Sequence, residues 1–429
     1  MQQQPISIFP VVPVGLDQML CRREARVQSQ MRILNRFGLP IVSFSLNIPG
    51  PIKDTPAARL LFWAGLQAMQ QALGPGVYQK TYFGPTGPEA IVVCRMSPRA
   101  LKAAAEKIEA SHIAGRLFDM DVIDTDGKKL SRQEPRRCIV CGGEVLPCAR
   151  TRAHGLAELT RKTRHLLDSY AAPCFAAAAR QALIDEVDFT PKPGLVDANN
   201  TGAHQDMTRE LFHKSAQALA PYFERFYLTG STQPDDMGVL WQLGLEAGEA
   251  MLDATGGVNT HKGSIFSFGL LLGALGASMH DGKPLFPRVQ HLASRLPPQS
   301  PESHGARMYA RFGAGGARAE AESGFLLAQQ ACRVMDEADA MRALLHLMAS
   351  CEDTNVLYRG GRDGLSFMKA QSCAILQAPQ AQQEALMLEL DRQMIARNLS
   401  PGGCADLFAM ALFLHRLGLC AQKDSEETI

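Results

Sequence analysis

The hydrophobic pattern of the chain changes character across residues 161–174, and this change limits what the chain can fold into. Before it, short apolar and β-branched runs, such as 40–49 and 90–96, lie between Gly and Pro clusters, as is typical of strands. The segment 100–110 is predicted to be a helix. After it, long stretches rich in Ala, Leu and Met follow, and apolar residues recur at helical spacing in 240–254. The sequence therefore predicts two domains, the first α+β and the second all-α.

We place the first domain at residues 1–168 and the second at 175–429. The changeover contains no run of Gly, Ser or Pro, so we expect a helix to join the domains in place of a flexible linker. The chain has 429 residues, of which 46% are hydrophobic and 20% charged, as in a globular protein with substantial buried cores. This composition excludes a minimal binding module, a disordered chain and a fibrous protein.

The charges are unevenly distributed along the chain. Residues 1–170 hold 23 Lys and Arg against 14 Asp and Glu, whereas residues 171–429 hold 21 against 29. A positive first half favours an anionic partner, such as a group of phosphates or an acidic protein. The alternative is that both halves simply carry ordinary solvated charges.

The chain shows no signal for membrane insertion or secretion. It has no run of eighteen apolar residues, and residues 1–16 lack both a basic segment and a cleavage pattern. We therefore expect a soluble cytoplasmic protein with no membrane partner. The 11 cysteines are an odd number, scattered through a chain too large to depend on disulfides. They are expected to be reduced thiols, with one candidate metal cluster among them.

Two aspartates stand at i and i+2 in the apolar run 115–122. If this run is a strand, Asp119 and Asp121 point to the same face, as a Mg²⁺ ion held by carboxylates and substrate phosphates requires. Two solvated aspartates at a strand end are the alternative. Several arginines accompany them, and guanidinium groups bind phosphate oxygens in bidentate fashion. The arginines are Arg116, Arg132, Arg136 and Arg137. The pattern predicts a phosphotransfer site, with Asp119, Asp121 and Arg116 catalytic and Arg132 and Arg137 binding substrate.

Three cysteines and a histidine follow these arginines. The spacing Cys138-x2-Cys141-x6-Cys148, followed by His154, is compatible with a Cys3His zinc site. Three buried free thiols are the alternative. His112, which precedes the Gly-Arg turn, is either a base or a structural histidine with satisfied hydrogen bonds.

Together these motifs resemble a known family. They are PGPIKD (49–54), TGPE (86–89), GRLFDMDV (115–122), LSR (130–132) and RRCIVC with CAR and the histidine after it (136–154). Over most of residues 5–165 the chain resembles holo-citrate-lyase acyl-carrier-protein synthases, the apo-citrate lyase phosphoribosyl-dephospho-CoA transferases. The resemblance implies a nucleotidyltransferase in which a carrier serine attacks triphosphoribosyl-dephospho-CoA and pyrophosphate leaves. It also implies a metal, an acidic carrier protein as partner, and substrate binding by Lys53 in the first motif.

In the second half, polar residues gather in loops between helical stretches. Loop 190–207 holds Lys192, Asp197, Asn200, His204 and Asp206, and such polar loops are more often functional than mere connections. Loop 256–263 ends on Asn259, Thr260, His261 and Lys262, directly before the apolar helix predicted at 264–277. Free N–H groups and the helix dipole favour anions there, so a triphosphate is expected at this end. The alternative is that Asn259 and Thr260 only cap the helix.

Further polar segments, at 316–324, 352–361 and 398–407, are expected to converge with these loops at one end of a helical domain. We predict His204, Glu249 and His261 as catalytic residues, with Glu249 lying in the helix predicted at 240–254. The predicted substrate-binding residues are Lys192, Asn200, Asn259, Lys262, Arg318, Asn355 and Arg359. The predicted Mg²⁺ ligands are Asp197, Asp206 and Asp353. No GxxxxGK[ST] loop is present, which disfavours a P-loop mechanism.

The loop motifs PKPGLVD, GAH-x-DM, GVNTHKG, GAR-x-EAE, DTN and SPGG-x-ADL are similar to those of triphosphoribosyl-dephospho-CoA synthases, across about 180–415. One departure is Cys404, which stands where the family pattern has Ser. The resemblance implies transfer of the triphosphoribosyl group of ATP to a ribose hydroxyl of dephospho-CoA, with adenine leaving. Such a step develops oxocarbenium character that a carboxylate stabilises, and it needs a base for the acceptor hydroxyl.

We interpret the chain as a fusion of two consecutive enzymes that make and attach the citrate lyase prosthetic group. One rival is a zinc-bearing adaptor or RNA-binding module, but a pI of about 7.6 and 7% aromatic residues argue against nucleic acid as a partner. A second rival is a Mg²⁺-dependent hydrolase of ribosyl linkages, with water as the acceptor. The equivalent malonate decarboxylase system is an alternative client.

Overall fold

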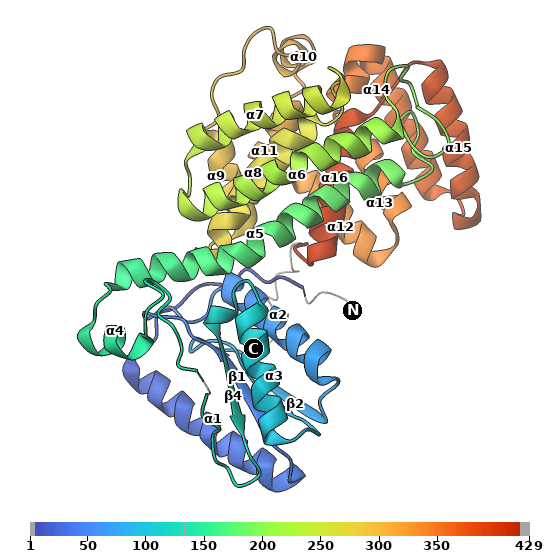
Figure 1. Cartoon of the computed structure of the whole chain (residues 1–429). Coiled ribbons are helices and arrows are strands. Elements are labelled where there is room, and N and C mark those ends of the chain that lie inside the picture. Colours follow the sequence, from blue (N-terminus) through green and yellow to red (C-terminus); the bar gives the residue numbers. More distant parts are fainter. Residues whose placement is uncertain (1–4, 133, 421–429) are drawn as a thin grey trace, which may run out of the picture. The chain divides into compact units, whose positions relative to one another are not determined.

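The structure is a computed structural model that describes residues 5–132 and 134–420. It divides into two compact units, and the predicted two-domain organisation is confirmed. The N-terminal unit contains residues 8–173 and 279–283, and the C-terminal unit contains the remaining residues. Helix α5 (Leu156–Asp188) runs without interruption through the division between Pro173 and Cys174 (Figure 1).

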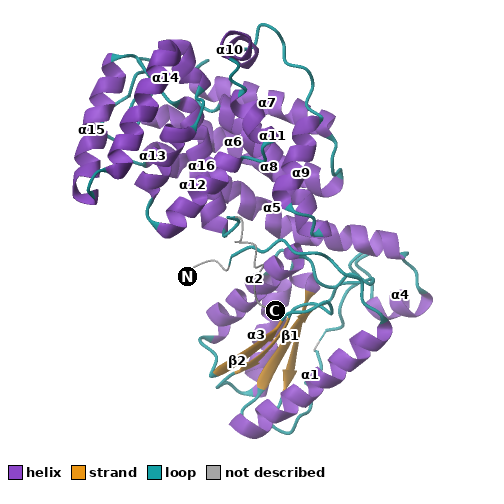
Figure 2. Ribbon diagram, turned by 180° about the vertical axis from the view of Figure 1, so that it is seen from behind, coloured by secondary structure: helices purple, strands orange, loops and turns teal. Residues whose placement is uncertain are grey.

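The N-terminal unit is built on a four-stranded antiparallel sheet (Figure 2). Its strands are β2 (Tyr78–Tyr82), β3 (Glu89–Val93), β1 (Ile41–Leu46) and β4 (Phe118–Ile123), in that spatial order. The strands predicted in 40–49 and 90–96 are confirmed, and the run 115–122 is a strand from Phe118 onward. Strand β4 lies at one edge, where its partner β1 places Ser45 opposite Asp119 and Ser43 opposite Asp121.

Helices cover the sheet because its side chains alternate between two apolar layers. Helix α1 (Leu16–Phe37) packs Ile33 and Leu34 against Ile41, Ile91 and Ile123. On the other face Phe44 stacks on Phe62 of α2 (Pro56–Leu73), with ring centroids 5.0 Å apart. Helix α3 (Pro98–Ser111) confirms the helix predicted at 100–110 and packs along β4. A 3-10 turn (Gly115–Leu117) leads into β4, and the short helix α4 (Val145–Thr151) precedes α5.

In the C-terminal unit the described residues form helices joined by loops. After α5 come α6 (Arg209–Thr232), α7 (Met237–Thr255), α8 (Lys262–Asp281), α9 (Leu285–Ser294), α10 (His304–Phe312), α11 (Gly316–Glu322), α12 (Leu326–Glu337), α13 (Ala340–Ser350), α14 (Thr354–Gln377), α15 (Gln380–Ala396) and α16 (Gly402–Leu417). The helices predicted around 240–254 and 264–277 are confirmed. Leu240, Leu243, Ala247 and Met251 form the buried face of α7, as their spacing predicts.

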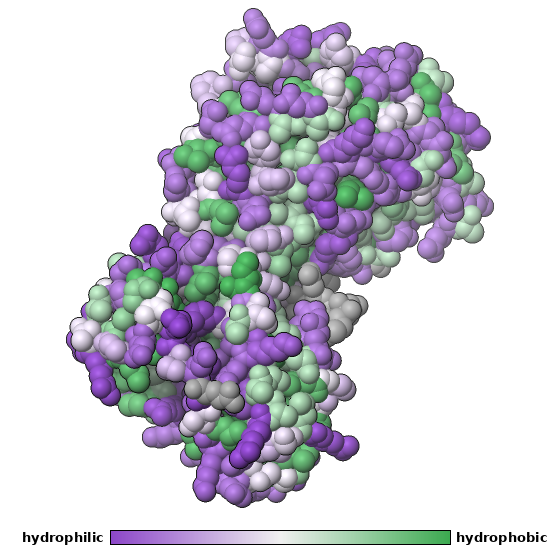
Figure 3. Space-filling model, in the orientation of Figure 1, coloured by the Kyte–Doolittle hydropathy of each residue, from purple (hydrophilic) through white to green (hydrophobic). Residues whose placement is uncertain are grey.

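Helix α8 is the most apolar core helix of the chain's described part. It has the length and hydropathy of a membrane span, but 83% of its most apolar window is buried in the protein. Its environment is therefore that of a core helix. The molecular face in Figure 3 shows mainly hydrophilic side chains, with apolar ones scattered among them.

One cysteine pair departs from the expectation of reduced thiols. Cys332 and Cys420 are joined by a disulfide, with their Cα atoms 5.9 Å apart and a sequence separation of 88. The expectation is wrong for this pair because α12, which holds Cys332, packs against α16, which ends at Leu417 shortly before Cys420. Such proximity between distant segments leaves no trace in the spacing of the cysteines.

Glycines allow α6 and α8 to pack closely. A Cβ atom at Gly230 in α6 would lie 1.8 Å from the carbonyl oxygen of Gly273 in α8, so the two backbones approach too closely for any side chain. By contrast, a Cβ atom at Gly248 in α7 would meet nothing within 4 Å. The contact between α6 and α8 thus depends on Gly230.

We expect Gly230→Ala to lower the free energy of unfolding of the C-terminal unit by about 3 kcal/mol, because the helices must separate. Gly248→Ala should raise it by about 0.5–1 kcal/mol, because alanine reduces the entropy lost in helix formation. Scanning calorimetry of the two variants measures both effects. Equal responses of the two variants would contradict the packing described for α6 and α8.

Candidate functional sites

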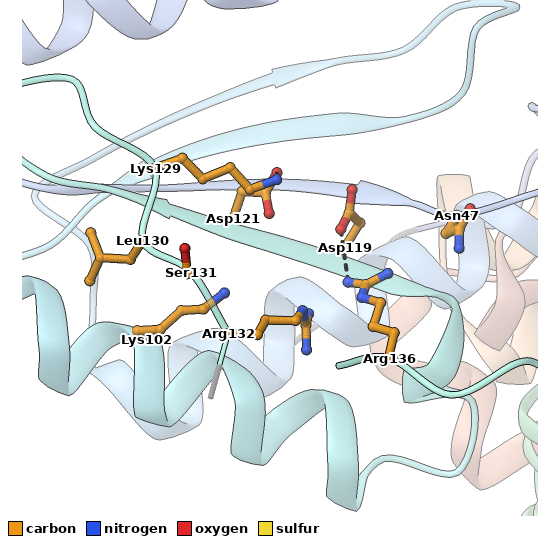
Figure 4. Close-up of a pocket in the computed structure, with 9 residues that line it drawn as sticks. All are labelled: Asn47, Lys102, Asp119, Asp121, Lys129, Leu130, Ser131, Arg132 and Arg136. Carbon is orange, nitrogen blue, oxygen red and sulfur yellow. Dashed lines mark hydrogen bonds and ion pairs between the residues drawn. The ribbon is translucent and has the colours of Figure 1, made fainter. Parts of the chain in front are cut away.

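Strand β4 brings the two predicted aspartates together. Phe118, Met120 and Val122 are buried, while Asp119 and Asp121 lie between them on the opposite face, as predicted. The aspartates line a cavity of about 360 Å³, which we call the β4 cavity. Its other lining residues are Asn47, Lys102, Lys129, Leu130, Ser131, Arg132 and Arg136. Figure 4 shows the aspartates on β4 and the side chains of Lys102, Arg132 and Arg136 on the side toward α3.

Glu109 of α3 organises the arginines of this cavity. It accepts a hydrogen bond from Arg136 at 3.1 Å, pairs with Arg132, and accepts the Met120 backbone N–H at 2.8 Å. Arg136 Nη2 also donates to Asp119 Oδ1 at 2.8 Å. Sequence analysis missed Glu109, since a glutamate in an Ala-rich helix has the pattern of a solvated face. Its role follows from the position of α3 along the free edge of β4.

Lys102 was also missed, and it differs from the other cations of the cavity. Only 5% of the residue is exposed, yet its Nζ has no hydrogen-bond partner among the described residues. The closest carboxylate oxygen in an ion pair with it belongs to Glu106, at 3.7 Å. Burial lowers the pKa of Lys102, and the charge of Arg132 lowers it further. By contrast, Lys129 Nζ lies 2.5 Å from Asp121 Oδ2.

The other predicted residues of this half lie outside the cavity lining. Arg116 donates to the Arg137 carbonyl at 2.6 Å, and Arg137 is exposed. Lys53 donates to the Ile48 carbonyl at 2.5 Å, and burial lowers its pKa. His112 accepts the Ala114 N–H at 3.2 Å and packs against the Phe118 ring, which supports the structural alternative for this histidine.

The predicted zinc ligands do meet in space. The sulfur atoms of Cys138, Cys141 and Cys148 and a ring nitrogen of His154 all lie within 4.8 Å of one another. These four residues are called the cysteine cluster below.

In the C-terminal unit, Lys192 and His261 meet in the interior. Lys192 is 1% exposed, and its Nζ donates to Glu186 Oε1 at 2.5 Å. His261 is 3% exposed, its Nδ1 lies 2.7 Å from Ser215 Oγ, and its Nε2 has no hydrogen-bond partner in the described chain. Burial lowers the pKa of His261 to about 3, with a further contribution from the charge of Lys192. This imidazole is therefore neutral at physiological pH.

Two further buried carboxylates accompany them. Asp406 of α16 accepts a hydrogen bond from Ser264 Oγ, and burial raises its pKa to about 7, with the negative charges of Glu186 and Asp353 adding to the rise. Burial also raises the pKa of Glu186, against the effect of Lys192. Sequence analysis missed both Glu186 and Asp406, although Asp406 lies within the SPGG-x-ADL motif that it singled out. We call Glu186, Lys192, His261, Asp353 and Asp406 the buried charge cluster.

Asp353 and Asp197 are held by backbone N–H groups. Asp353 accepts the N–H groups of Asn355 and Val356 at the start of α14 and that of Cys404 at 2.9 Å. Burial raises its pKa. Asp197 accepts the N–H groups of Lys192, Asn199 and Asn200 within its own loop. Both carboxylates therefore fix the shape of the loops that border the cluster.

A second group of bonds closes loop 190–207 against the end of α15. Asp391, which sequence analysis missed, accepts the Gly194 N–H and the Asn200 side-chain amide, each at 2.8 Å. His204 Nε2 lies 2.8 Å from Ser400 Oγ, and Arg359 lies 3.3 Å from His204 Nδ1. Burial and the charge of Arg359 lower the pKa of His204. His204 and Arg359, both predicted site residues, therefore lie side by side, and Asn200 is bonded to Asp391.

Other predicted residues occupy the surface or hold loops. Glu249, Asp206 and Lys262 are exposed. Asn259 accepts the Lys262 N–H at 3.2 Å, which is the helix cap that was the alternative reading for this residue. Arg318 donates to the carbonyls of Leu296 and Pro297, and so fixes the chain after α9. The Asn355 side chain lies beside Gly402, where a Cβ atom would come within 2.5 Å of it.

The β4 cavity and the buried charge cluster both suit a transferase. A cavity rich in guanidinium and ammonium groups and a buried cluster of carboxylates, lysine and histidine suit the transfer of phosphorylated groups in two separate reactions. Comparison with known proteins identifies the family of each half of the chain. Residues 14–170 match the family of apo-citrate lyase phosphoribosyl-dephospho-CoA transferases, and residues 173–425 match that of ATP:dephospho-CoA triphosphoribosyl transferases. The chain belongs to the CitXG family, which joins both domains, and it is a bifunctional transferase.

Relatives cover nearly the whole chain. Protein CitXG of Haemophilus influenzae is 34% identical over 93% of this chain and 96% of its own length. Protein CitXG of Leuconostoc mesenteroides is 29% identical over 94% of this chain and 97% of its own. The 2-(5''-triphosphoribosyl)-3'-dephosphocoenzyme-A synthase of Haemophilus ducreyi is 39% identical, with 66% of this chain matched to all of the relative. The two resemblances found in the sequence are therefore confirmed.

The raised pKa of Asp406 predicts how stability depends on pH. The folded protein keeps a proton on this carboxyl up to about pH 7, whereas the unfolded chain releases it near the ordinary value of 3.8. The stability of the substrate-free C-terminal unit should therefore fall as the pH rises from about 4 to 7. Asp406→Asn should remove part of this fall, while Asp253→Asn, at an exposed site on α7, should not. Thermal midpoints across this pH range provide the measurement, and identical profiles for both variants would contradict the assignment.

Proposed function

We propose that the β4 cavity binds the phosphates of triphosphoribosyl-dephospho-CoA and attaches the phosphoribosyl-dephospho-CoA part to a serine of the citrate lyase acyl carrier protein. The observation that carries this proposal is Lys102, a buried cation in the cavity wall without a hydrogen-bonding anion. A buried ammonium group in this state gains most from an anionic ligand. We also propose that the N-terminal unit is a nucleotidyltransferase-like domain.

In this reaction the serine oxygen bonds to the phosphorus atom, and the bond from that phosphorus to pyrophosphate breaks. Lys102, Arg132 and Arg136 would hold the departing pyrophosphate, because all three face the same cavity. Asp119 or Asp121 would take the serine proton. The positive charge of residues 1–170 supports an acidic carrier as the partner.

Magnesium is the metal that we propose for this cavity. Asp119 and Asp121 fit it, because both carboxylates lie on one strand face, line the same cavity and are partly exposed. Carboxylate oxygens are the ligands that Mg²⁺ prefers, together with substrate phosphates. When bound, the ion would supply charge to stabilise the phosphate oxygens during transfer.

For the C-terminal unit, we propose that the buried charge cluster transfers the triphosphoribosyl group of ATP to dephospho-CoA. The support is His261, a neutral imidazole whose Nε2 is buried without a partner. In the tautomer that donates Nδ1–H to Ser215 Oγ, Nε2 is free to accept the proton of the acceptor hydroxyl. The ribose C1 would then exchange its bond to adenine for one to the acceptor oxygen. Glu186, which is paired with Lys192, would supply a carboxylate for the oxocarbenium-like ribose.

The crowding of Glu186, Asp353 and Asp406 also suits a cation. Burial raises the pKa of Asp406 to about 7, and the negative charges of Glu186 and Asp353 add to this rise, so a divalent ion beside these carboxylates would stabilise their ionised forms. We therefore propose that Mg²⁺ accompanies the triphosphate of ATP in this unit. Adenine release that depends on dephospho-CoA would separate this transferase from the hydrolase alternative, in which water suffices.

We expect Lys102→Met to slow attachment from presynthesised donor by about tenfold to a hundredfold, since a charge-assisted hydrogen bond contributes roughly 1.5–3 kcal/mol. Adenine release should not change, because the C-terminal unit performs it. The matched control is Lys107→Met, at an exposed position of the same helix. Equal attachment rates in the two variants would show that the phosphates bind elsewhere. Parallel assays with the carrier proteins of citrate lyase and of malonate decarboxylase would identify which carrier is modified.

We expect His261→Gln to slow adenine release by about a hundredfold or more, because glutamine can form hydrogen bonds but cannot take up a proton. Attachment from presynthesised donor should be unaffected. His213→Gln, at a surface position of α6, serves as the control. A His261→Gln variant with normal kcat and normal pH dependence would show that another group removes the acceptor proton.

A further inference from the structure

The cysteine cluster has the donor set of a structural metal site. Its three sulfur atoms and one ring nitrogen lie within 4.8 Å of one another, and Cys141 Sγ is 3.6 Å from Cys148 Sγ. Three thiolates and an imidazole are a common ligand set for tetrahedral zinc. The donors come from two short pieces of chain, a turn that holds Cys138 and Cys141 and the region of α4 that holds Cys148 and His154.

The backbone of the turn is already shaped around a sulfur atom. Gly142 N–H donates to the Cys138 carbonyl at 3.0 Å, and Cys138 N–H donates to the Gly143 carbonyl at 2.7 Å. This tight turn needs a positive φ of 71° at Gly142. Val140 N–H points at Cys138 Sγ from 3.4 Å.

His154 supplies the second, independent observation. Its Nε2 is buried and has no hydrogen-bond partner in the part of the chain that the structure describes. Its Nδ1 lies 3.5 Å from Oε2 of Glu158, which stands in the first turn of α5. A carboxylate at one ring nitrogen is the usual way in which proteins orient a metal-binding histidine. The imidazole thus stands next to the sulfur atoms with one nitrogen lacking a partner, as a metal ligand would.

The cluster is continuous with the arginines of the β4 cavity. Arg136 precedes Cys138 by two residues, and its carbonyl accepts the Val145 N–H at 3.2 Å. Arg137 forms an isolated bridge with Glu144, and its carbonyl accepts the Arg116 side chain. Between β4 and α4 the described residues form only turns and isolated bridges, so little regular structure holds Arg136 in place.

We propose that Cys138, Cys141, Cys148 and His154 bind one zinc ion, and that this ion fixes the backbone from which Arg136 reaches Asp119 and Glu109. The metal takes no part in the chemistry of attachment. The bonds from the ion to its four ligands would hold the turn and the region of α4 together where no helix or strand does so. Structural zinc sites stabilise folds in this way. The positional part of this proposal rests on the proposed function of the β4 cavity, whereas the zinc site itself does not.

The first experiment measures metal in the full chain, prepared under reducing conditions with added zinc and without chelators. Elemental analysis should find about one zinc ion per chain in the parent protein. Cys141→Ser should lose it, Cys21→Ser, at an exposed cysteine of α1, should keep it, and His154→Cys should also keep it, since four thiolates bind zinc as well. Replacement by Co²⁺ should give thiolate-to-cobalt absorption bands. A parent protein without zinc, or a Cys141→Ser variant with the parent's zinc content, would overturn the proposal.

The second experiment tests the positional role with excess Mg²⁺ present. In Cys141→Ser, attachment from presynthesised donor should fall by about tenfold to a hundredfold, as expected when a binding group is misplaced. Adenine release should persist, which shows that the C-terminal unit is folded, and the circular dichroism of the variant should match that of the parent. The separate variant His154→Cys, which keeps four zinc ligands, should keep attachment. Loss of zinc with normal attachment would refute the positional role. Failure of the parent protein to attach the donor would instead refute the proposed function, and it would leave the zinc stoichiometry as a separate result.

Discussion

The Lys192–Glu186 ion pair lies in the interior of the C-terminal unit, with side-chain exposures of 1% and 5%. A single buried charge at either position would be strongly destabilising, so each residue is retained only with its partner. The pair then adds to the effect of burial on the protonation of its neighbours. The charge of Lys192 helps to keep His261 neutral, and that of Glu186 helps to keep a proton on Asp406. The compensation of these buried charges therefore helps to decide which groups of the unit can accept a proton and which already carry one.

The N-terminal unit must also compensate its buried charges, but there the excess charge is positive. Its cavity holds more cationic than anionic groups, and one carboxylate, Glu109, serves two arginines. Lys102 is left without a hydrogen-bonded anion. One unit thus favours added negative charge, and the other favours added positive charge. The uneven charge of the two halves of the sequence has the same pattern, positive in the first half and negative in the second.

The sequence by itself determined the features that depend on local periodicity and spacing. A period of two placed Asp119 and Asp121 on one face of a strand, and a period of 3.6 placed Leu240 and Met251 on the buried face of a helix. Motif loops marked Lys192 and His261 before any fold was known. In each case the information lies within one segment, because backbone geometry fixes which side chains share a face.

Only the tertiary structure decided which faces meet. Glu109 and Lys102 lie on a helix whose pattern is compatible with solvent, and they became site residues because α3 packs along the free edge of β4. Asp406 is part of the buried charge cluster because α16 packs against α8, where Ser264 donates a hydrogen bond to it. Glu249 carries an equally suitable carboxylate, but it lies on an exposed face of α7. The physical reason is that a side chain's pKa and partners depend on burial and on charges from distant segments, and local sequence contains neither.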